Sequence, residues 1–185
     1  MEIKKLGNNV LNFSINRILE ITGIGIAIIG LLLLISFFSF SPDDPNFIFP
    51  ENIQIKNLLG FRGSFTADLF FQSLGFIALL IPFTLIFTGI NIILSKKIFL
   101  IIETSFYTIL YSLPGSLFFS IYYPTAFKLY INGNGGFIGK YLETTFLNSL
   151  INFNSDISYY LLILLILNLF LISIQFKITY FYRLN

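Results

Sequence analysis

The chain has 185 residues, of which 56% are apolar and only 11% are charged, against roughly 25% charged in a soluble domain. Its mean hydropathy of +0.84 is too apolar for one soluble core of this length, so lipid must solvate much of it. A net charge of +2 without a basic arm excludes direct nucleic-acid binding by this segment. The absence of Cys and His excludes disulfides, imidazole catalysis and most zinc or haem sites, so no metal or cofactor is expected.

The first predicted span covers residues 17–40 and follows a polar N-terminal segment, 1–16, which we expect in the cytoplasm. This span begins too late, is too long and lacks the small-residue cleavage site of a signal peptide, so we expect it to stay uncleaved. Gly23, Ala27 and Gly30 fall three or four residues apart, on one face of a helix. Small residues at this spacing let a neighbouring helix approach closely.

The first outer loop is predicted over residues 41–68, and its first half is rich in proline, which disfavours a long helix there. Gly60 and Gly63 indicate turns. Ser64 is the expected N-cap of the next helix, and Asp68 is expected at the helix start.

Residues 69–95 carry no charge and form the second predicted span. At about 40 Å of helix it exceeds a hydrocarbon core of roughly 30 Å, so we expect a kink at Pro82. The third predicted span, 98–123, is expected to break at Pro114-Gly115. Only Lys96-Lys97 separates these two spans, which predicts an antiparallel pair.

The second outer loop is predicted over residues 124–156. It contains a strong turn signal at 132–136 and a partly amphipathic stretch at 137–153 that predicts a short interfacial helix. The fourth predicted span covers 157–176, and the aromatic and basic tail 177–185 is typical of an exit into the cytoplasm.

The distribution of Lys and Arg predicts the orientation, because cytoplasmic loops carry an excess of both. With both termini inside, seven basic residues lie on the inner side: Lys4, Lys5, Arg17, Lys96, Lys97, Lys177 and Arg183. Four lie in the longer outer loops: Lys56, Arg62, Lys128 and Lys140. The predicted architecture is an all-α membrane protein, a four-transmembrane-helix bundle with both termini cytoplasmic.

Polar residues inside the spans are expected to be structural. Glu103 lies close to the inner lysines and is expected to snorkel or to pair with Lys96 or Lys97. The amides of Gln72, Asn91 and Asn168 are expected to bond to other helices.

No enzyme is predicted in this segment. The glycine-rich stretch from Gly133 to Lys140 lacks the Walker A spacing, and Tyr141 stands where that motif requires Ser or Thr. No catalytic pair or set of midplane ionisable groups is present.

Two sequence patterns occur together at the first outer loop. The first span ends in Ser39-Phe-Ser41-Pro42-Asp43-Asp44-Pro45, and Asn57-Leu-Leu-Gly60-Phe-Arg-Gly63-Ser64-Phe-Thr-Ala67-Asp68 precedes the second. These patterns resemble the N-terminal four-transmembrane domain of the FtsK/SpoIIIE family of bacterial DNA translocases. The turn Gly135-Gly136-Phe-Ile-Gly139 is also similar to that family's pattern after the third span.

The resemblance implies a membrane anchor at the division septum, in the bacterial inner membrane, that contacts other divisome membrane proteins and serves cell division and chromosome partition. It also implies a homo-oligomer, a hexamer in the full-length family, driven by a motor domain that these residues do not contain. Whether such a motor follows Asn185 or is encoded separately stays open. The alternative is a small multi-pass transporter or channel subunit built around kinks at Pro82 and Pro114.

The candidate site is an outer-face motif with two interpretations. Its residues either contact partner proteins or cap and turn the helix ends. They are Ser41, Pro42, Asp43, Asp44, Pro45, Asn57, Gly60, Gly63, Ala67 and Asp68.

The predicted orientation can be tested with a reporter enzyme that is active only in the periplasm. We expect activity for fusions at Asn52 and Asn134 and none for a fusion at Lys97, because the inner lysines hold that turn in the cytoplasm. The reverse pattern would overturn the orientation.

Overall fold

The structure, a computed structural model, describes residues 2–44, 54–125, 132–145, 149, 151 and 154–174. All regular structure in these residues is helical: α1 (Glu2–Phe38), α2 (Gly60–Leu74), the 3-10 helix η1 (Gly75–Leu79), α3 (Leu80–Ser95), α4 (Leu100–Tyr122), α5 (Gly136–Glu143) and α7 (Ser155–Ser173). The all-helical prediction is confirmed for these residues. Pro45, Lys128, most of 146–153 and the tail 177–185 carried predictions and lie outside the described residues.

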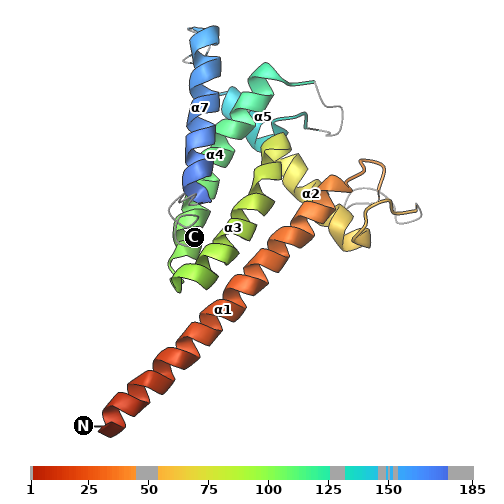
Figure 1. The fold of residues 1–185 in the computed structure, drawn as a ribbon. Coiled ribbons are helices and arrows are strands. Elements are labelled where there is room, and N and C mark those ends of the chain that lie inside the picture. Colours follow the sequence, from red (N-terminus) through yellow and green to blue (C-terminus); the bar gives the residue numbers. More distant parts are fainter. Residues whose placement is uncertain are drawn as a thin grey trace, which may run out of the picture.

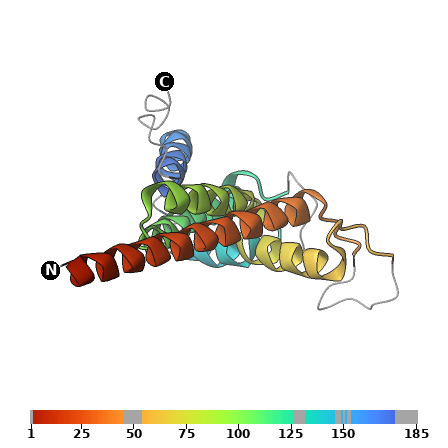
Figure 2. The ribbon, with the colours of Figure 1, turned by 60° about the horizontal axis from the view of Figure 1, so that its bottom comes forward.

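The helices form an open bundle in which α3 and α4 are central (Figures 1 and 2). α1 packs along α3 on one side, and α7 packs along α4 on the other. α2 and α5 pack together at the end of the bundle opposite the start of α1 (Figure 1). The start of α1, the α3–α4 turn and the last turn of α7 therefore share one end, as the predicted topology requires.

Three helical stretches of the described chain are long and apolar enough to cross a membrane: Asn9–Phe38, Gly60–Ser95 and Ser155–Ser173. α4 corresponds to the remaining predicted span and has 23 residues, about 34 Å of helix. Glu103 and several Ser and Tyr residues interrupt its apolar sequence, and it is not among the three stretches. The lipid-facing character of the bundle is plain in α7, where only 6% of the apolar window is buried within the protein.

The predicted small-residue face of α1 is confirmed. α1 and α3 run antiparallel, and a Cβ atom added at Gly30 would lie 2.9 Å from both the Pro82 carbonyl oxygen and the Ile86 nitrogen. A Cβ atom at Gly23 would lie 2.7 Å from the carbonyl oxygen of Gly89. The two backbones approach this closely because side chains are missing at the crossing.

The first two helices begin earlier than predicted. α1 begins at Glu2 rather than residue 17, because residues 2–16 contain no proline and extending an existing helix adds a hydrogen bond per residue. α2 begins at Gly60 rather than residue 69. The prediction that Ser64 caps this helix was wrong, since Ser64 lies inside α2 and is buried.

The second span is interrupted, but not at Pro82. The interruption is η1, at residues 75–79, and Pro82 is the third residue of α3. A proline is tolerated there because the first turn of a helix has no internal partner for its N–H groups. The expected break at Pro114-Gly115 was also wrong, since α4 runs through both residues. Gly115 instead leaves space for Ile77, whose Cγ1 atom lies 2.3 Å from where a Cβ atom would be.

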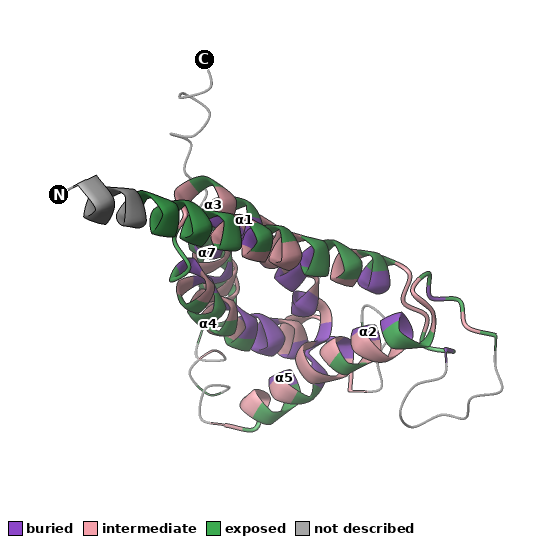
Figure 3. Cartoon of the chain, turned by 90° about the horizontal axis from the view of Figure 1, so that it is seen from below, coloured by how far each residue is buried: buried purple, intermediate pink, exposed green. Residues whose placement is uncertain are grey.

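Three hydroxyl groups meet inside the bundle and join α3, α4 and α7. The Thr84 hydroxyl lies 3.0 Å from the Tyr111 hydroxyl and 3.2 Å from the Ser173 hydroxyl. All three residues are buried, and buried residues gather on the faces that the helices turn toward one another (Figure 3). They satisfy one another at a depth where water is scarce.

The end of the bundle that contains the α3–α4 turn is held by an ion pair that was not predicted. The Lys96 ammonium binds Glu20 of α1, so the expected pairing of Glu103 with Lys96 or Lys97 was wrong. Glu103 has no ion pair within the part of the chain that the structure describes. Lys96 ends α3 in a left-handed conformation (φ 57°), and this turn aims its side chain at α1.

The contacts predicted for three side-chain amides have different outcomes. Asn91 donates to the carbonyl oxygen of Ile174 at 3.0 Å and so joins α3 to the end of α7, as expected. Gln72 accepts from the Asn132 backbone nitrogen at 3.3 Å. Asn168 instead donates to Leu164 in its own helix at 2.7 Å, because its face of α7 is exposed and no helix lies opposite.

The close approach of α1 to α3 predicts opposite effects for two glycines of one helix. Gly30→Ala should lower the free energy of unfolding in detergent by about 1–3 kcal/mol, because the added methyl group meets α3 backbone atoms. Gly25→Ala is the control, since no atom lies within 4 Å of its added Cβ atom. It should leave stability unchanged or raise it by up to about 1 kcal/mol. Equal effects of the two changes would contradict the proposed packing.

Candidate functional site: the polar junction of α1 and α2

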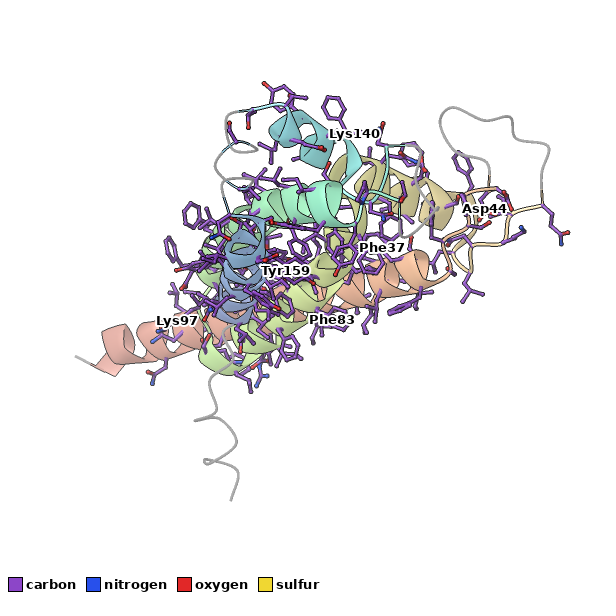
Figure 4. All side chains as sticks on the ribbon, turned by 90° about the horizontal axis from the view of Figure 1, so that it is seen from above. Phe37, Asp44, Phe83, Lys97, Lys140 and Tyr159 are labelled. Atoms are coloured by element: carbon purple, nitrogen blue, oxygen red, sulfur yellow. The ribbon has the colours of Figure 1, made fainter. Side chains whose placement is uncertain are left out.

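The junction between α1 and α2 is held by Asp44. Its carboxylate accepts one hydrogen bond from the Lys56 backbone nitrogen and one from the Asn57 backbone nitrogen, each at 2.8 Å. The Asp44 nitrogen donates to the Ser41 carbonyl oxygen at 3.2 Å. Asp44 is only 2% exposed. Its two hydrogen bonds hold Lys56 and Asn57 against the end of α1 (Figure 4).

Asn57 satisfies backbone groups at the ends of both helices. Its side-chain nitrogen donates to the Ser36 carbonyl oxygen in the last turn of α1 at 2.9 Å. Its side-chain oxygen accepts from the Leu59 nitrogen at 3.1 Å, and its carbonyl oxygen accepts from the Gly60 nitrogen at 2.9 Å. One residue therefore caps the end of α1 and the start of α2, whose terminal groups have no partners within their own helices.

Two serines, one in the last turn of α1 and one just after it, complete the junction. The Ser36 hydroxyl donates to the carbonyl oxygen of Gly63 at 2.6 Å. The Ser39 hydroxyl donates to Ile35 at 2.7 Å and accepts from the Leu58 nitrogen at 3.1 Å. We call the group Ser36, Ser39, Asp44, Asn57 and Gly63 the clasp.

Gly63 belongs to the clasp because no other residue fits its position. A Cβ atom there would lie 2.2 Å from the side-chain oxygen of Asn57. Gly63 lies within α2, so the expectation that it forms a turn was wrong. Gly60 begins α2 with a φ of +65°, a conformation that favours glycine, and its role as a turn former is confirmed.

An aromatic cluster lies directly beneath the clasp. Ala67 is fully buried and Phe71 is 2% exposed. The ring centroids of Phe37 and Phe71 are 4.9 Å apart, and those of Phe40 and Phe71 are 5.0 Å apart. Ala67 leaves room for these rings, so its role in the motif is packing.

The structure separates the candidate site residues into an inner and an outer group. Asp44, Asn57, Gly63 and Ala67 are buried, whereas Pro42 and Asp43 are exposed and Ser41 is half-buried. Asp68 lies in the middle of α2, where it accepts from Gln72 at 3.3 Å, so the prediction that it starts the helix was wrong. Pro45 lies outside the described residues.

Ser36 was not predicted as a site residue, and Ser39 was noted only as part of the family pattern. The only available signal was a pair of hydroxyl residues near the end of an otherwise apolar run, and such residues often bond within their own helix. Their partners, Gly63 and Leu58, are more than fifteen residues away in the chain, so spacing could not reveal them.

The exposed rim of the junction carries one ion pair. The Lys56 ammonium lies 3.0 Å from the Asp43 carboxylate. The hydrogen bond to Asp43 raises the pKa of Lys56 above its usual value. Leu58, beside it, is 78% exposed. The described residues contain no group of three or more His, Cys, Asp or Glu side chains that could hold a metal ion.

A second junction closes the break between α2 and α3. The Ser116 hydroxyl of α4 donates to the Leu74 carbonyl oxygen at 2.8 Å, and the Phe76 nitrogen donates to the Asn134 carbonyl oxygen at 2.8 Å. Gly75 has a φ of +73°, and a Cβ atom there would lie 1.9 Å from that Asn134 oxygen. The carbonyl and the N–H freed by the break are thus satisfied by α4 and the second outer loop.

The predicted helix in the second outer loop is confirmed as α5. Its glycines pack it against α4, since a Cβ atom at Gly139 would lie 2.4 Å from the Ser116 carbonyl oxygen and one at Gly135 would lie 2.5 Å from it. The Ser120 hydroxyl of α4 also donates to Glu143 at 2.5 Å. The Gly135–Gly139 pattern therefore serves close packing against α4.

These features define a multi-pass helical membrane domain whose motifs build junctions between helices. A family model described as the 4TM region of DNA translocase FtsK/SpoIIIE matches residues 16–182. The chain belongs to this family.

One relative is a protein named DNA translocase FtsK from Azospirillum brasilense. It is 32% identical over 88 residues, which cover 46% of this chain and 14% of the relative. The matched part is thus a small fraction of the relative's length. No solved structure matches the chain.

The clasp predicts very different effects at two neighbouring aspartates. Asp44→Ala should lower the free energy of unfolding in detergent by about 2–4 kcal/mol, because two charge-assisted hydrogen bonds are lost. Asp43→Ala should lower it by less than about 1 kcal/mol, because an exposed ion pair contributes little. Hydrogen exchange at the Lys56 and Asn57 amides gives a local measurement. Similar losses for both variants, or unchanged exchange in Asp44→Ala, would contradict the role assigned to Asp44.

Proposed function

We propose that this chain is the membrane anchor and divisome-interaction domain of an FtsK-like DNA translocase acting in cell division and chromosome segregation. The observation that carries the proposal is the family match over residues 16–182. The clasp supports it, because Ser39, Asp44, Asn57 and Gly63 belong to the two sequence patterns that resemble the family. The domain resides in the bacterial inner membrane, at the division septum, with both termini in the cytoplasm.

The segment acts by binding and positioning, and catalysis belongs to a motor domain outside these residues. The buried polar groups of the clasp are occupied by backbone partners, so they are not free to bind a substrate. DNA is contacted by the motor and not by this domain. Copies of the domain associate in the membrane, which brings six motors together.

The contact surface for other divisome proteins is the exposed rim of the α1–α2 junction. Asp43 and Lys56 are solvent-exposed, with 71% and 62% of their side-chain areas accessible, and Leu58 stands beside them. The clasp holds this rim rigidly at the outer end of α1. Protein interfaces commonly have an apolar centre and a polar rim. The exposed Leu58 and the ion pair beside it have this combination.

A fluorescent protein fused after Asn185 tests the septal role. We expect a midcell band in dividing cells. Uniform envelope fluorescence in dividing cells would contradict the proposal and would favour the transporter or channel alternative.

The same experiment tests the rim through a charge change. The double variant Asp43→Lys with Lys56→Glu keeps an ion pair but reverses its direction, and we expect it to insert normally and to lose most of the midcell band. Lys140→Glu on α5 is the matched control and should keep the band. If both variants keep it, the contact surface lies elsewhere.

A further inference from the structure

A groove of about 230 Å³ lies where α2 crosses α1. Ile29, Leu32 and Leu33 of α1 line it, together with Leu59, just before α2, and Arg62 of α2. Gly63 also borders the groove, and its missing side chain keeps the groove open. The result is an apolar trough with one cation at its edge.

The apolar wall of this groove faces lipid. Ile29 is 54% exposed and Leu32 is 45% exposed, and both lie in the stretch Asn9–Phe38, which is long and apolar enough to cross a membrane. Side chains on this face of α1 point away from α3, whose contacts are made by the opposite, glycine-rich face. An acyl chain is therefore the natural neighbour of these residues.

Arg62 is available to a ligand. It is exposed, and it has no ion-pair partner within the part of the chain that the structure describes. The nearby hydroxyls are already engaged, since Thr66 donates to the Arg62 carbonyl oxygen at 2.7 Å and Ser36 donates to Gly63 at 2.6 Å. The charge is thus the one unsatisfied polar feature of the groove.

A guanidinium beside an apolar trough matches an anionic amphiphile. The planar guanidinium binds phosphate oxygens through paired hydrogen bonds, and Arg62 is the third residue of α2, where the positive end of the helix dipole adds attraction for an anion. We propose that this groove binds one anionic phospholipid, with its phosphate on Arg62 and an acyl chain along Ile29, Leu32 and Leu33. The charge of Arg62 selects the headgroup, and the trough selects a lipid over a soluble anion.

Native mass spectrometry of the purified 185-residue chain, titrated in detergent with phosphatidylglycerol or phosphatidylcholine, tests the proposal. One phosphatidylglycerol should bind in preference to phosphatidylcholine, and Arg62→Gln should weaken its binding roughly fivefold, the effect of one interfacial cation. Lys140→Gln, at an exposed cation on α5 away from the clasp (Figure 4), should change binding less than about twofold. Equal losses in the two variants, or no loss in Arg62→Gln, would overturn the site.

A second pair of variants tests the trough without changing charge. Leu32→Trp fills the groove and should reduce phosphatidylglycerol binding, whereas Ile28→Trp, an equally exposed neighbour outside it, should not. Inorganic phosphate at millimolar concentration should not compete. Competition by phosphate together with normal binding by Leu32→Trp would reduce the site to a simple anion contact and overturn the lipid assignment. Since these measurements use purified protein, their failure is distinct from a loss of midcell localisation.

Discussion

In the interior of a bilayer, a helix can be interrupted only where other groups replace the hydrogen bonds that it loses. The break at η1 meets this requirement through α4 and the loop that follows it. The Ser116 hydroxyl donates to the Leu74 carbonyl oxygen, and the Asn134 carbonyl oxygen accepts from the Phe76 nitrogen. The positions of α2 and α5 at this end of the bundle depend on this arrangement. α2 turns away from α3 at Gly75, packs against α5 and reaches the end of α1, where the clasp holds it.

The two junctions are built in the same way. In each, a side chain from one element satisfies the backbone of another, and a glycine removes the Cβ atom that would prevent the approach. Asn57 and Gly63 play these parts in the clasp, and Ser116 and Gly75 play them at the break. The sequence patterns that resemble the family are therefore needed for the packing of these helices. The exposed residues around Asp43 lie outside this packing and can change without disturbing it.

The sequence allowed prediction of properties that depend on local composition. The apolar runs located the long helices, and the spacing of Gly23, Ala27 and Gly30 identified the face of α1 that packs on α3. It did not allow prediction of properties that depend on distant partners. Pro82 looked like the kink, but the break is at Gly75 because its partners, Ser116 and Asn134, come from later elements. Glu103 looked like the partner of Lys96, but Glu20 lies closer in space although it is 76 residues away in the chain. Ser64 and Asp68 looked like a helix start, but α2 begins at Gly60, whose nitrogen donates to the carbonyl oxygen of Asn57. The position of Asn57 depends in turn on the distant Ser36.

The sequence separations within the two junctions imply an order of assembly. The clasp closes through contacts between residues 12 to 27 positions apart, whereas the break at Gly75 waits for Ser116, 42 positions after Leu74, and its neighbour Gln72 waits for Asn132, 60 positions later. Chains emerge from the N-terminus during synthesis, and nearby contacts close faster than distant ones. The first hairpin can therefore be complete while the freed backbone groups near Gly75 still lack partners. Until α4 arrives, those groups are satisfied only by water near the surface, so the second helix can reach its final depth only after the third has entered the membrane.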